Sequence, residues 1–408
     1  DALRADHLGA YGYPLDQKNL STFAKDSLVY ENAFTTLPTT QPAISSIFTS
    51  MYPRAHTVRK NGLVLPDEAL TLAEILKKNG WKTAAFVSAF PLDRRFKLDQ
   101  GFDDYKDSIG QNGPQKGFKF EVPGDRMTNA VLRYLKKHPV SEKQFLWIHY
   151  FDPHAPYKPP KRFNSVKSPL PNASAALSAY DGEIQFLDEQ VGILIDQLKK
   201  RGIWKNTLVI LVSDHGEGFG EHGYTGHGWF LYDEVIRVAL MMHGPGIKPG
   251  RSSFLIQHVD LAPGILDYFG IPVPGTFEGK SWWNVLQGKL APRDAVWVER
   301  RLPPIATGPE LAADEETHPG AEEKWTYRTA TAKFIWSSDG KYEYYDLTKD
   351  PLEKNNLYTP GNAQAAELEK QGIALRDRAQ RLALKPGRDL QQQDEESREG
   401  LKALGYIN

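Results

Sequence analysis

The feature that most constrains the fold is an apolar run that ends abruptly in polar residues and glycines. Five apolar residues, 208–212, precede Ser213-Asp214-His215 and a glycine-rich stretch. An uninterrupted apolar run of this length is typical of a strand covered on both faces, and glycines allow the backbone to turn tightly after it. In open α/β sheets, ligands bind at the carboxyl ends of strands. The segment therefore predicts a buried strand that delivers Asp214 and His215 to a metal ion.

The first residues of the chain repeat this order of residue types. Asp1 is followed closely by Arg4, Asp6, His7 and glycines. We expect Asp1 to lie at a strand end as well, and we expect this sequence to be part of a longer protein, because the apolar run that would form the strand is not in it. A signal peptide or anchor would be lost with that segment, so the location stays open. A bacterial periplasmic or extracellular location is favoured over a cytoplasmic one.

Composition narrows the class of protein. The chain has 408 residues, 40% of them hydrophobic, with 50 basic against 51 acidic side chains. The balance of charge argues against nucleic acid or an anionic membrane surface as the main partner, and no run is long enough for a membrane-spanning helix. The chain contains no cysteine, which excludes disulfides, thiolate metal sites and cysteine nucleophiles.

Apolar strand-like runs alternate with helical periodicity along the first part of the chain. This alternation predicts an α/β fold with a mostly parallel sheet flanked by helices. We expect residues 1–290 to form the catalytic domain. The expected elements include a helix over Leu70–Asn79, strands over Trp81–Val87 and Gln144–Tyr150, and a long amphipathic helix over Ala175–Lys200 that stops at Arg201-Gly202.

The pattern of residue types changes after residue 290. Residues 291–408 are predicted to form a small α+β subdomain that begins with a surface loop over Pro303–Glu323. The charged tail Asp389–Gly400 is predicted to be mobile before residues 401–406 dock. Between loop and tail, the patterns predict antiparallel strands over Tyr327–Ala332, Lys333–Ser337 and Lys341–Tyr345, then a helix over Ala363–Leu384.

Several motifs in fixed order resemble the sulfatase family of the alkaline phosphatase superfamily, almost from end to end. Their order and spacing are hard to obtain by chance. The resemblance implies an alkaline-phosphatase-like fold and a metal-dependent hydrolase of sulfate or phosphate esters. The motifs are Asp1-Ala-Leu-Arg-Ala-Asp-His, Thr40-Gln-Pro, Phe48-Thr-Ser-Met-Tyr-Pro-Arg-Ala-His56, Thr71-Leu-Ala-Glu-Ile-Leu, Phe151-Asp-Pro-His-Ala-Pro-Tyr, Ser213-Asp-His-Gly-Glu, Gly226-His-Gly and Tyr345-Asp-Leu-Thr-Lys-Asp-Pro-Leu-Glu.

One departure from the family pattern matters most. Sulfatases carry Cys or Ser in a Cys/Ser-X-Pro-Ser-Arg motif, whose first residue becomes formylglycine. Here the matching residues are Thr40-Gln41-Pro42-Ala43-Ile44, so the resemblance predicts formylglycine-independent chemistry with Thr40 as the nucleophile, as in the phosphoesterase branches. A cation beside the hydroxyl would favour its alkoxide form. The alternative is a threonine that caps the helix after Pro42.

The resemblance implies roles for the other polar residues. In the favoured version one divalent metal ion (Ca, Mn or Zn) is bound by Asp1, Thr40, Asp214 and His215. The ester is then held and protonated by Asn61, His154 and His227, although Asn61 with Gly62 could equally form a turn. In the alternative version, a second metal ion is bound by Asp152, His154 and His227.

The remaining motifs admit both functional and structural interpretations. Glu217, Glu221 and His222 could orient the ligands, although a solvated acidic loop is the favoured interpretation for Glu221. Trp282-Trp283 could shape a sugar pocket or pack in the core. We expect structural or surface roles for His56, His243 and His258, and a helix cap at Asp260. The substrate is predicted to be a small-molecule, glycan or lipid ester. Two alternatives stay open: a phosphoglycerol or phosphoethanolamine transferase, and an inactive binding homologue.

Overall fold

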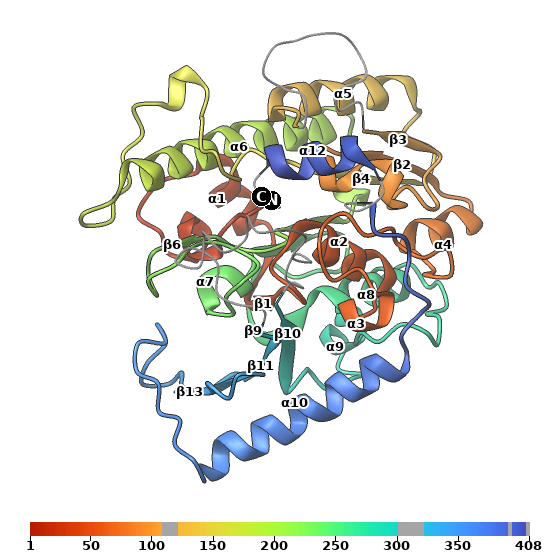
Figure 1. Ribbon diagram of the computed structural model, residues 1–408. Coiled ribbons are helices and arrows are strands. Elements are labelled where there is room, and N and C mark those ends of the chain that lie inside the picture. Colours follow the sequence, from red (N-terminus) through yellow and green to blue (C-terminus); the bar gives the residue numbers. More distant parts are fainter. Residues whose placement is uncertain (108–120, 301–321, 391–393, 405–408) are drawn as a thin grey trace.

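The strands at the centre of the molecule form two sheets (Figure 1). The computed structural model describes residues 1–107, 121–300, 322–390 and 394–404. The first sheet is all parallel and has the order β3 (Asp104–Lys106), β2 (Lys82–Phe86), β4 (Gln144–Ile148). The second sheet has the order β5 (Val209–Val212), β8 (Leu240–His243), β1 (Leu28–Phe34), β9 (Gly250–Gln257). It is mixed because β8 runs antiparallel to β5 and β1, whereas β1 and β9 are parallel.

Helices cover the sheets, as predicted for an α/β fold. In Figure 1, α5 and α6 lie above the strands, and α2, α8 and α9 lie below and beside them. The long helix α6 (Ala175–Lys200) has the predicted bounds, because the Ser174 side chain caps it by accepting a hydrogen bond from Leu177 N at 3.0 Å. The other helices here are α1 (Lys18–Lys25), α2 (Thr40–Thr49), α3 (Pro53–His56), α4 (Leu72–Lys78), α5 (Gly124–Lys137), α8 (Leu261–Tyr268) and α9 (Trp282–Leu286).

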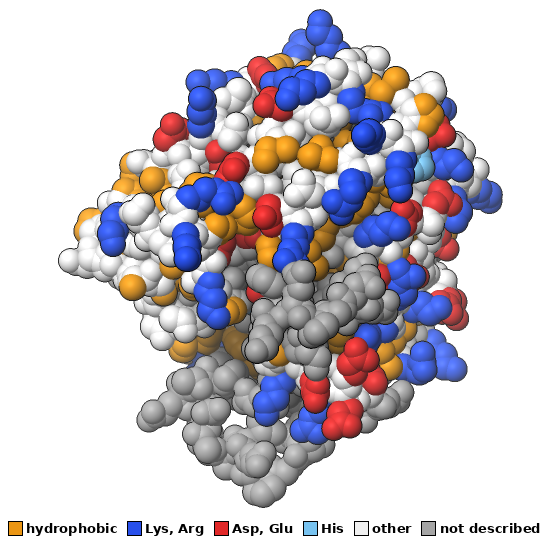
Figure 2. Space-filling view, turned by 90° about the horizontal axis from the view of Figure 1, so that it is seen from above, with side chains coloured by type: hydrophobic (Ala, Val, Ile, Leu, Met, Phe, Trp, Pro, Cys, Tyr) orange, Lys and Arg blue, Asp and Glu red, His pale blue; other side chains and the backbone are white. Residues whose placement is uncertain are grey.

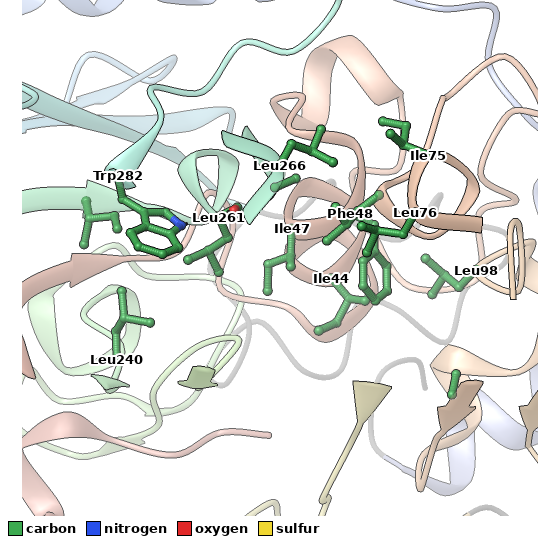
Figure 3. Close-up of a cluster of buried hydrophobic side chains, with 14 of the residues drawn as sticks. Ile44, Ile47, Phe48, Ile75, Leu76, Leu98, Leu240, Leu261, Leu266 and Trp282 are labelled. Carbon is green, nitrogen blue, oxygen red and sulfur yellow. Dashed lines mark hydrogen bonds between the residues drawn. The ribbon is translucent and has the colours of Figure 1, made fainter. Parts of the chain in front are cut away.

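The largest apolar cluster surrounds α2 (Figure 3). Every residue of this helix is buried, which is unusual because most helices expose one face. Phe48 packs edge-on against Trp147 of β4, with ring centroids 4.8 Å apart. Trp282 is only 2% exposed and belongs to this cluster, so it packs in the core. Burial on all sides fixes α2, and therefore the position of its first residue, Thr40.

The C-terminal strands form a separate antiparallel sheet, as predicted. Helix α10 (Ala363–Arg381) lies along this sheet (Figure 1) and contacts β11 (Lys324–Thr329) and β12 (Ala332–Ser337). A Cβ atom at Gly372 of α10 would lie 2.1 Å from the Trp325 ring, so only glycine permits this close approach. The order is β10 (Ala295–Glu299), β11 (Lys324–Thr329), β12 (Ala332–Ser337), β13 (Glu343–Asp346). Strand β10 was not predicted, and most of the predicted loop 303–323 lies outside the described residues.

The charged tail differs from its prediction. Residues 395–403, expected to be largely mobile, form helix α12 (Glu395–Ala403). Asp394 caps this helix by accepting a hydrogen bond from Ser397 N at 2.9 Å, and Arg95 pairs with Asp394 at 3.3 Å. Leu401 is fully buried against an apolar cluster. The predicted mobility of residues 395–400 was wrong because charge density alone ignores the helix cap. The predicted docking is confirmed for Leu401, and residues 391–393 and 405–406 of the predicted tail lie outside the described residues.

A buried charge network joins this C-terminal sheet to the glycine-rich segment after β5. Helix α7 (Asp233–Ile236) begins at Asp233, which pairs with Arg328 of β11 at 2.9 Å and with Lys333 of β12 at 3.0 Å. Glu353 accepts a hydrogen bond from Asp233 N at 2.7 Å and pairs with Lys333 at 2.5 Å. Although burial alone would raise it, the neighbouring cations hold the pKa of Asp233 well below its usual range. The network therefore holds ionised groups in the interior.

Replacing Lys333 with methionine is expected to destabilise the protein by about 3 kcal/mol, because removal of one partner leaves buried carboxylates without compensation. Lys333 is fully buried, whereas Lys341, in the connection between β12 and β13, has a side chain 83% exposed. Lys341→Met is the matched control and should change stability by less than about 0.5 kcal/mol. Thermal melting of the two variants tests this, and equal melting temperatures would contradict the assigned role of the network.

The outer surface mixes charges of both signs. On the face seen in Figure 2, Lys and Arg side chains are interspersed with Asp and Glu. Within the described parts of the chain, no helix has the length and apolar character needed to cross a membrane.

Candidate active site

Asp214 and His215 lie at the carboxyl end of β5, where the sequence predicts them. One carboxylate oxygen of Asp214, Oδ1, accepts hydrogen bonds from Ala2 N at 3.1 Å and from His215 N at 2.9 Å. The backbone turns immediately afterwards at Gly216, where a Cβ atom would lie 2.0 Å from the carbonyl oxygen of Glu234. Glycine is therefore required at residue 216. The second carboxylate oxygen of Asp214, Oδ2, faces His215 Nε2.

Asp1, Asp214 and a third residue, His149, bring their side chains together. His149 follows the last residue of β4, and its Nε2 lies 3.3 Å from Asp1 Oδ2. Asp1 Oδ1 lies 3.5 Å from His215 Nε2, which is itself 3.4 Å from Asp214 Oδ2. Among the described residues, only Asp1, His149 and Asp214 form a group of three or more His, Cys, Asp or Glu residues with ligand atoms all within 4.8 Å of one another.

Hydrogen bonds set the tautomers of both histidines. In His215, Nδ1–H donates to the carbonyl oxygen of Gly216 at 2.8 Å, so Nε2 carries the lone pair in the neutral ring. Ser88 Oγ donates its single proton to the carbonyl oxygen of His149 at 2.7 Å. It can therefore only accept from His149 Nδ1–H, 2.9 Å away. Both imidazoles thus present the lone pair of Nε2 to the carboxylates.

This arrangement is electrostatically unfavourable without a cation. Burial lowers the pKa of His215 to about 4 and that of His149 well below its usual range, so neither ring is protonated at neutral pH. Lone pairs and carboxylate oxygens then face one another, buried and without hydrogen bonds to the described residues: Asp1 Oδ1 and Oδ2, Asp214 Oδ2, His149 Nε2 and His215 Nε2. Such a set of oxygen and imidazole donors fits a divalent metal ion.

The segment that contains Asp1 is fixed from two sides. The hydroxyl of Tyr180 in α6 donates to the carbonyl oxygen of Ala2 and accepts from Arg4 N, both at 2.8 Å. The side chain of Arg4 donates to the carbonyl oxygen of Glu217 at 3.0 Å and pairs with Glu221. Arg4 therefore ties the Asp1 segment to the turn after β5.

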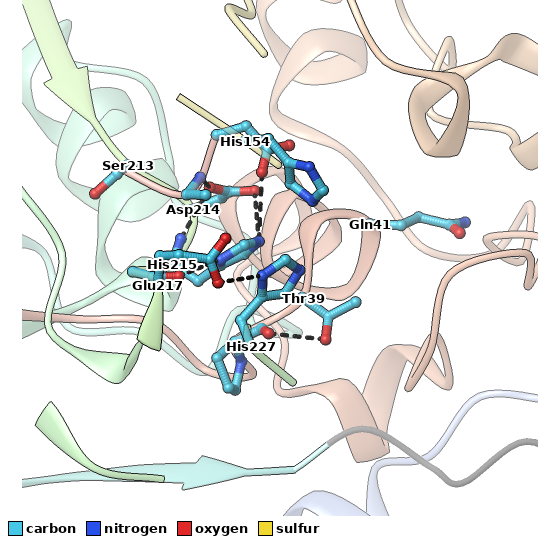
Figure 4. A network of polar contacts seen from close by, with 12 residues as sticks. Thr39, Gln41, His154, Ser213, Asp214, His215, Glu217 and His227 are labelled. Carbon is cyan, nitrogen blue, oxygen red and sulfur yellow. Dashed lines mark hydrogen bonds and ion pairs between the residues drawn. The ribbon is translucent and has the colours of Figure 1, made fainter. Parts of the chain in front are cut away.

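A row of three imidazoles continues from the carboxylate group (Figure 4). The ring centroid of His227 lies 4.1 Å from that of His215 and 5.1 Å from that of His154. Nδ1 of His154 donates to the carbonyl oxygen of Ala155 at 2.6 Å, and burial lowers the pKa of His154 to about 3. The predicted residues His154, His215 and His227 are therefore adjacent in space, although they come from two distant segments.

Glu217 orients His227 through a contact with the Nδ1 atom of its ring. Its Oε1 lies 3.1 Å from His227 Nδ1, and its Oε2 accepts a hydrogen bond from the Tyr157 hydroxyl at 3.0 Å. Glu217 is fully buried, so these contacts replace its hydration. The backbone on either side of His227 is left-handed, with φ of 82° at Gly226 and 91° at Gly228, which favours glycine at both positions.

Thr40 is the first residue of α2 and is fully buried. The residue in the capping position is Thr39, so the alternative of Thr40 as the helix cap does not apply. Thr39 makes no capping hydrogen bond with its side chain and donates instead to the carbonyl oxygen of Pro38 at 2.8 Å. In Figure 4, the side chain of Gln41 points away from the histidines.

Asn61 contacts the start of α2 directly. Its Oδ1 accepts a hydrogen bond from Gln41 N at 2.9 Å, which leaves the NH₂ group of the carboxamide as its donor. Gly62 has a φ of 92° and donates to Gln41 Oε1 at 2.7 Å, so a turn is also present. The two interpretations of Asn61 are compatible, because the turn places its side chain next to Thr40 in the fold.

Asp152 lies apart from the histidines with which it could share a second metal ion. Its Oδ1 accepts a hydrogen bond from Gly124 N, the first residue of α5, at 2.9 Å. Burial raises the pKa of Asp152 to about 6. In the part of the chain that the structure describes, Asp152, His154 and His227 are not among the groups whose ligand atoms converge. The geometry therefore favours the one-metal version.

His56, His243 and His258, the three histidines expected to have structural or surface roles, make structural contacts. His56 is fully buried and bonds Ser46 Oγ at 3.0 Å, and His243 stacks on Trp204. His258 is buried, and its Nε2 lies 3.0 Å from the carbonyl oxygen of Ser213, immediately before Asp214. Asp260 belongs to a capping box at residues 257–260, in agreement with its predicted role.

Sequence reasoning missed His149. The signal was present, because His149 is the first polar residue after the apolar run of β4, just as Asp214 follows that of β5 after a serine. The strand predicted over Gln144–Tyr150 placed His149 inside the strand and not after its end.

Solved structures of other proteins share this architecture. The fold matches a protein solved in complex with its substrate D-glucosamine-2-N,6-O-disulfate, with a TM-score of 0.76, 19% identity and 97% of each chain covered. It also matches the phosphonate monoester hydrolase of Agrobacterium radiobacter, with a TM-score of 0.75, 20% identity, and 93% of this chain and 94% of that chain covered. At these identities the likeness concerns the fold.

The family follows from the sequence comparisons. A family model described as Sulfatase matches residues 1–271, so the chain is a hydrolase of the sulfatase family in the alkaline phosphatase superfamily. It is 26% identical over 398 residues to the ulvan-active sulfatase of Formosa agariphila, covering 88% of this chain and 75% of that protein. It is 24% identical over 441 residues to the arylsulfatase of Clostridium perfringens, covering 88% of each.

Proposed function

We propose that this chain is a metal-dependent hydrolase that cleaves phosphate or phosphonate esters with Thr40 as its nucleophile and without formylglycine. The observation that supports it is the combination of a cysteine-free chain, a buried threonine at the start of α2, and a separate buried group in which carboxylates face imidazole lone pairs. Relatives named as sulfatases favour a sulfate ester, so the sulfate is the competing substrate.

A divalent ion fits the donor set of Asp1, Asp214 and His215 together with His149, with Thr40 as the further ligand proposed from the sequence. Once bound, such an ion supplies Lewis acidity, which favours the alkoxide form of the threonine and withdraws charge from the ester. The chain itself supplies the orientation, through the hydrogen bonds that fix each ligand atom.

The reaction proceeds in two displacement steps. Thr40 Oγ1 forms a bond to phosphorus while the bond from phosphorus to the leaving oxygen breaks. The proton of Thr40 passes to the pair His154 and His227, and a proton from this pair goes to the leaving oxygen, so the pair ends unchanged. Water then attacks phosphorus, the Oγ1–P bond breaks, and a proton of the water returns to Thr40. Asn61 donates to a nonbridging oxygen in both steps.

Turnover of matched aryl esters tests the proposal. The purified protein is loaded with Mn²⁺, Zn²⁺ or Ca²⁺ and given bis(4-nitrophenyl) phosphate, 4-nitrophenyl phenylphosphonate or 4-nitrophenyl sulfate. We expect metal-dependent release of nitrophenol from a phosphorus ester, with slower release from the sulfate. Preferential, metal-dependent sulfate cleavage would instead mean a sulfatase that works without formylglycine.

Two further outcomes bear on the alternatives. Added glycerol separates hydrolysis from transfer, because a transferase would form a glycerol ester in place of free acid. Absence of turnover together with absence of metal binding would favour an inactive homologue and would overturn the catalytic proposal.

A further inference from the structure

Residues 61–64 lie between the start of α2 and the part of the chain that follows α10. On the side of α2, the side chain of Gln41 accepts a hydrogen bond from Gly62 N at 2.7 Å and donates to the carbonyl oxygen of Leu63. Asn61 Oδ1 completes this contact by accepting a hydrogen bond from Gln41 N at 2.9 Å. Side-chain and backbone groups of the segment are therefore bonded to the first turn of α2.

The other side of the segment contacts residues 384–390, which we call the C-terminal strap. In Figure 1, this part of the chain rises from the end of α10 toward α12. Leu390 N donates to the carbonyl oxygen of Gly62 at 3.0 Å, and Val64 N donates to that of Arg388 at 2.8 Å. The two chains form an antiparallel bridge here, so the strap is joined to the segment by its backbone.

Side chains of the strap fit the same surface closely. A Cβ atom at Gly387 would lie 1.9 Å from the carbonyl oxygen of Val64, so the strap can come this near only with glycine at this position. Leu390 belongs to a buried apolar cluster that also contains Val64 and Phe151. The strap is therefore packed on the catalytic domain, although it follows the C-terminal sheet and α10 in the sequence.

An ion pair with little exposure joins the strap to the residue before Asn61. Lys60 Nζ lies 2.8 Å from Asp389 Oδ2, and the two side chains are 9% and 19% exposed. Salt and water screen such a pair less than a surface pair, and a buried ammonium group that loses its carboxylate is strongly destabilised. Because Lys60 immediately precedes Asn61, the pair fixes the backbone from which the Asn61 side chain extends.

We infer that Asp389 is a positioning residue for the reaction, because through Lys60 and the strap it holds the Asn61 carboxamide at the start of α2. The inference rests on the proposed function, in which Asn61 donates to a nonbridging oxygen. It adds to the active site a component from the C-terminal part of the chain. A donor of this kind must be held within about 0.5 Å of its productive position, so loosening the strap should lower kcat more than it changes KM.

Substitution of Asp389 tests this role. Asp389→Asn removes the charge and keeps the shape of the side chain, and we expect kcat on the preferred aryl ester to fall about tenfold with KM within about twofold. Asp389→Glu keeps the charge and should stay within about threefold of the wild-type kcat. Asp67→Asn is the matched control, because Asp67 is 77% exposed and pairs with Lys97 at 3.5 Å. It should leave kcat and KM within about twofold of the wild type.

A double-mutant cycle with Asn61→Ala separates positioning from a general loss of stability. In the Asn61→Ala background, Asp389→Asn should lower kcat by less than about twofold, because the group that it positions is absent. A purely structural effect of Asp389 would lower kcat by the same factor in both backgrounds.

Hydrogen exchange reports on the strap without any substrate. The amide of Val64 is bonded to the strap, so a peptide covering residues 60–66 should exchange at least about fivefold faster in Asp389→Asn than in the wild type. The same peptide in Asp67→Asn should exchange at the wild-type rate. Mass spectrometry of the purified proteins gives these rates.

Three results would overturn the inference: an Asp389→Asn variant with the kcat of the wild type, equal losses of kcat in the two backgrounds, or unchanged exchange of the 60–66 peptide. If the wild type cleaves no aryl ester, the proposed function fails separately. Titration calorimetry with inorganic phosphate then takes the place of kcat in the same cycle, and a wild type that binds no phosphate would overturn the inference as well.

Discussion

Replacement of Thr40 with alanine is expected to lower kcat on the preferred aryl ester at least about a thousandfold, because the covalent step loses its nucleophile. Thr40→Ser keeps a hydroxyl in a fully buried position at the start of α2 and should retain measurable turnover. In the wild type, mass spectrometry of a quenched reaction should find the transferred group on the peptide that contains Thr40.

The neighbouring threonine is the matched control. Thr39 is as deeply buried as Thr40, but its hydroxyl already donates to Pro38 O at 2.8 Å. Thr39→Ala should reduce kcat by less than about tenfold, a loss typical of supporting contacts. The reverse pattern, with an active Thr40→Ala and an inactive Thr39→Ala, would move the nucleophile by one residue.

Replacement of His149 with alanine is expected to weaken binding of a divalent metal ion by about a hundredfold or more, because one of the convergent donors is lost. Ser88→Ala should weaken binding by about tenfold, since Ser88 holds the ring through Nδ1 at 2.9 Å and sets its tautomer. Calorimetric titration of the metal-free protein with Mn²⁺ and Zn²⁺ gives both values without any substrate.

A surface histidine controls for the loss of imidazole as such. His138 at the end of α5 stacks on Tyr134 and is partly exposed. His138→Ala should leave metal affinity within about twofold of the wild type, since substitutions remote from a site have small effects. If His149→Ala behaves in the same way, His149 is not a ligand and the ion is held without it.

Local patterns in the sequence predicted the fold well where a cap or a strand end was explicit. The helix over Ala175–Lys200 has the bounds expected from its periodicity and the stop after Lys200. The polar residues after β5 predicted Asp214 and His215, because a buried strand determines where its last residues emerge. The antiparallel direction of β8 had no such signal, since strand direction depends on pairing with distant segments.

Most residues of the candidate site could be singled out in the sequence, but His149 and the assembly of the site could not. The metal group combines Asp1, the end of β4 and the end of β5, so the proximity of His149 to Asp1 exists only in three dimensions. The tautomers depend on Ser88 and on a carbonyl oxygen, which no motif specifies. Whether Thr40 attacks and which ester it attacks stay predictions for the experiments above.

The Asp233 network has a consequence for how the family diversifies. Asp233 closes the segment that begins with Asp214, yet its partners Arg328 and Lys333 belong to the C-terminal sheet. In a homologue with a different C-terminal sheet, the buried carboxylate at position 233 would lack its cationic partners. The two parts should therefore be inherited together, and in an alignment of relatives position 233 should covary with positions 328 and 333.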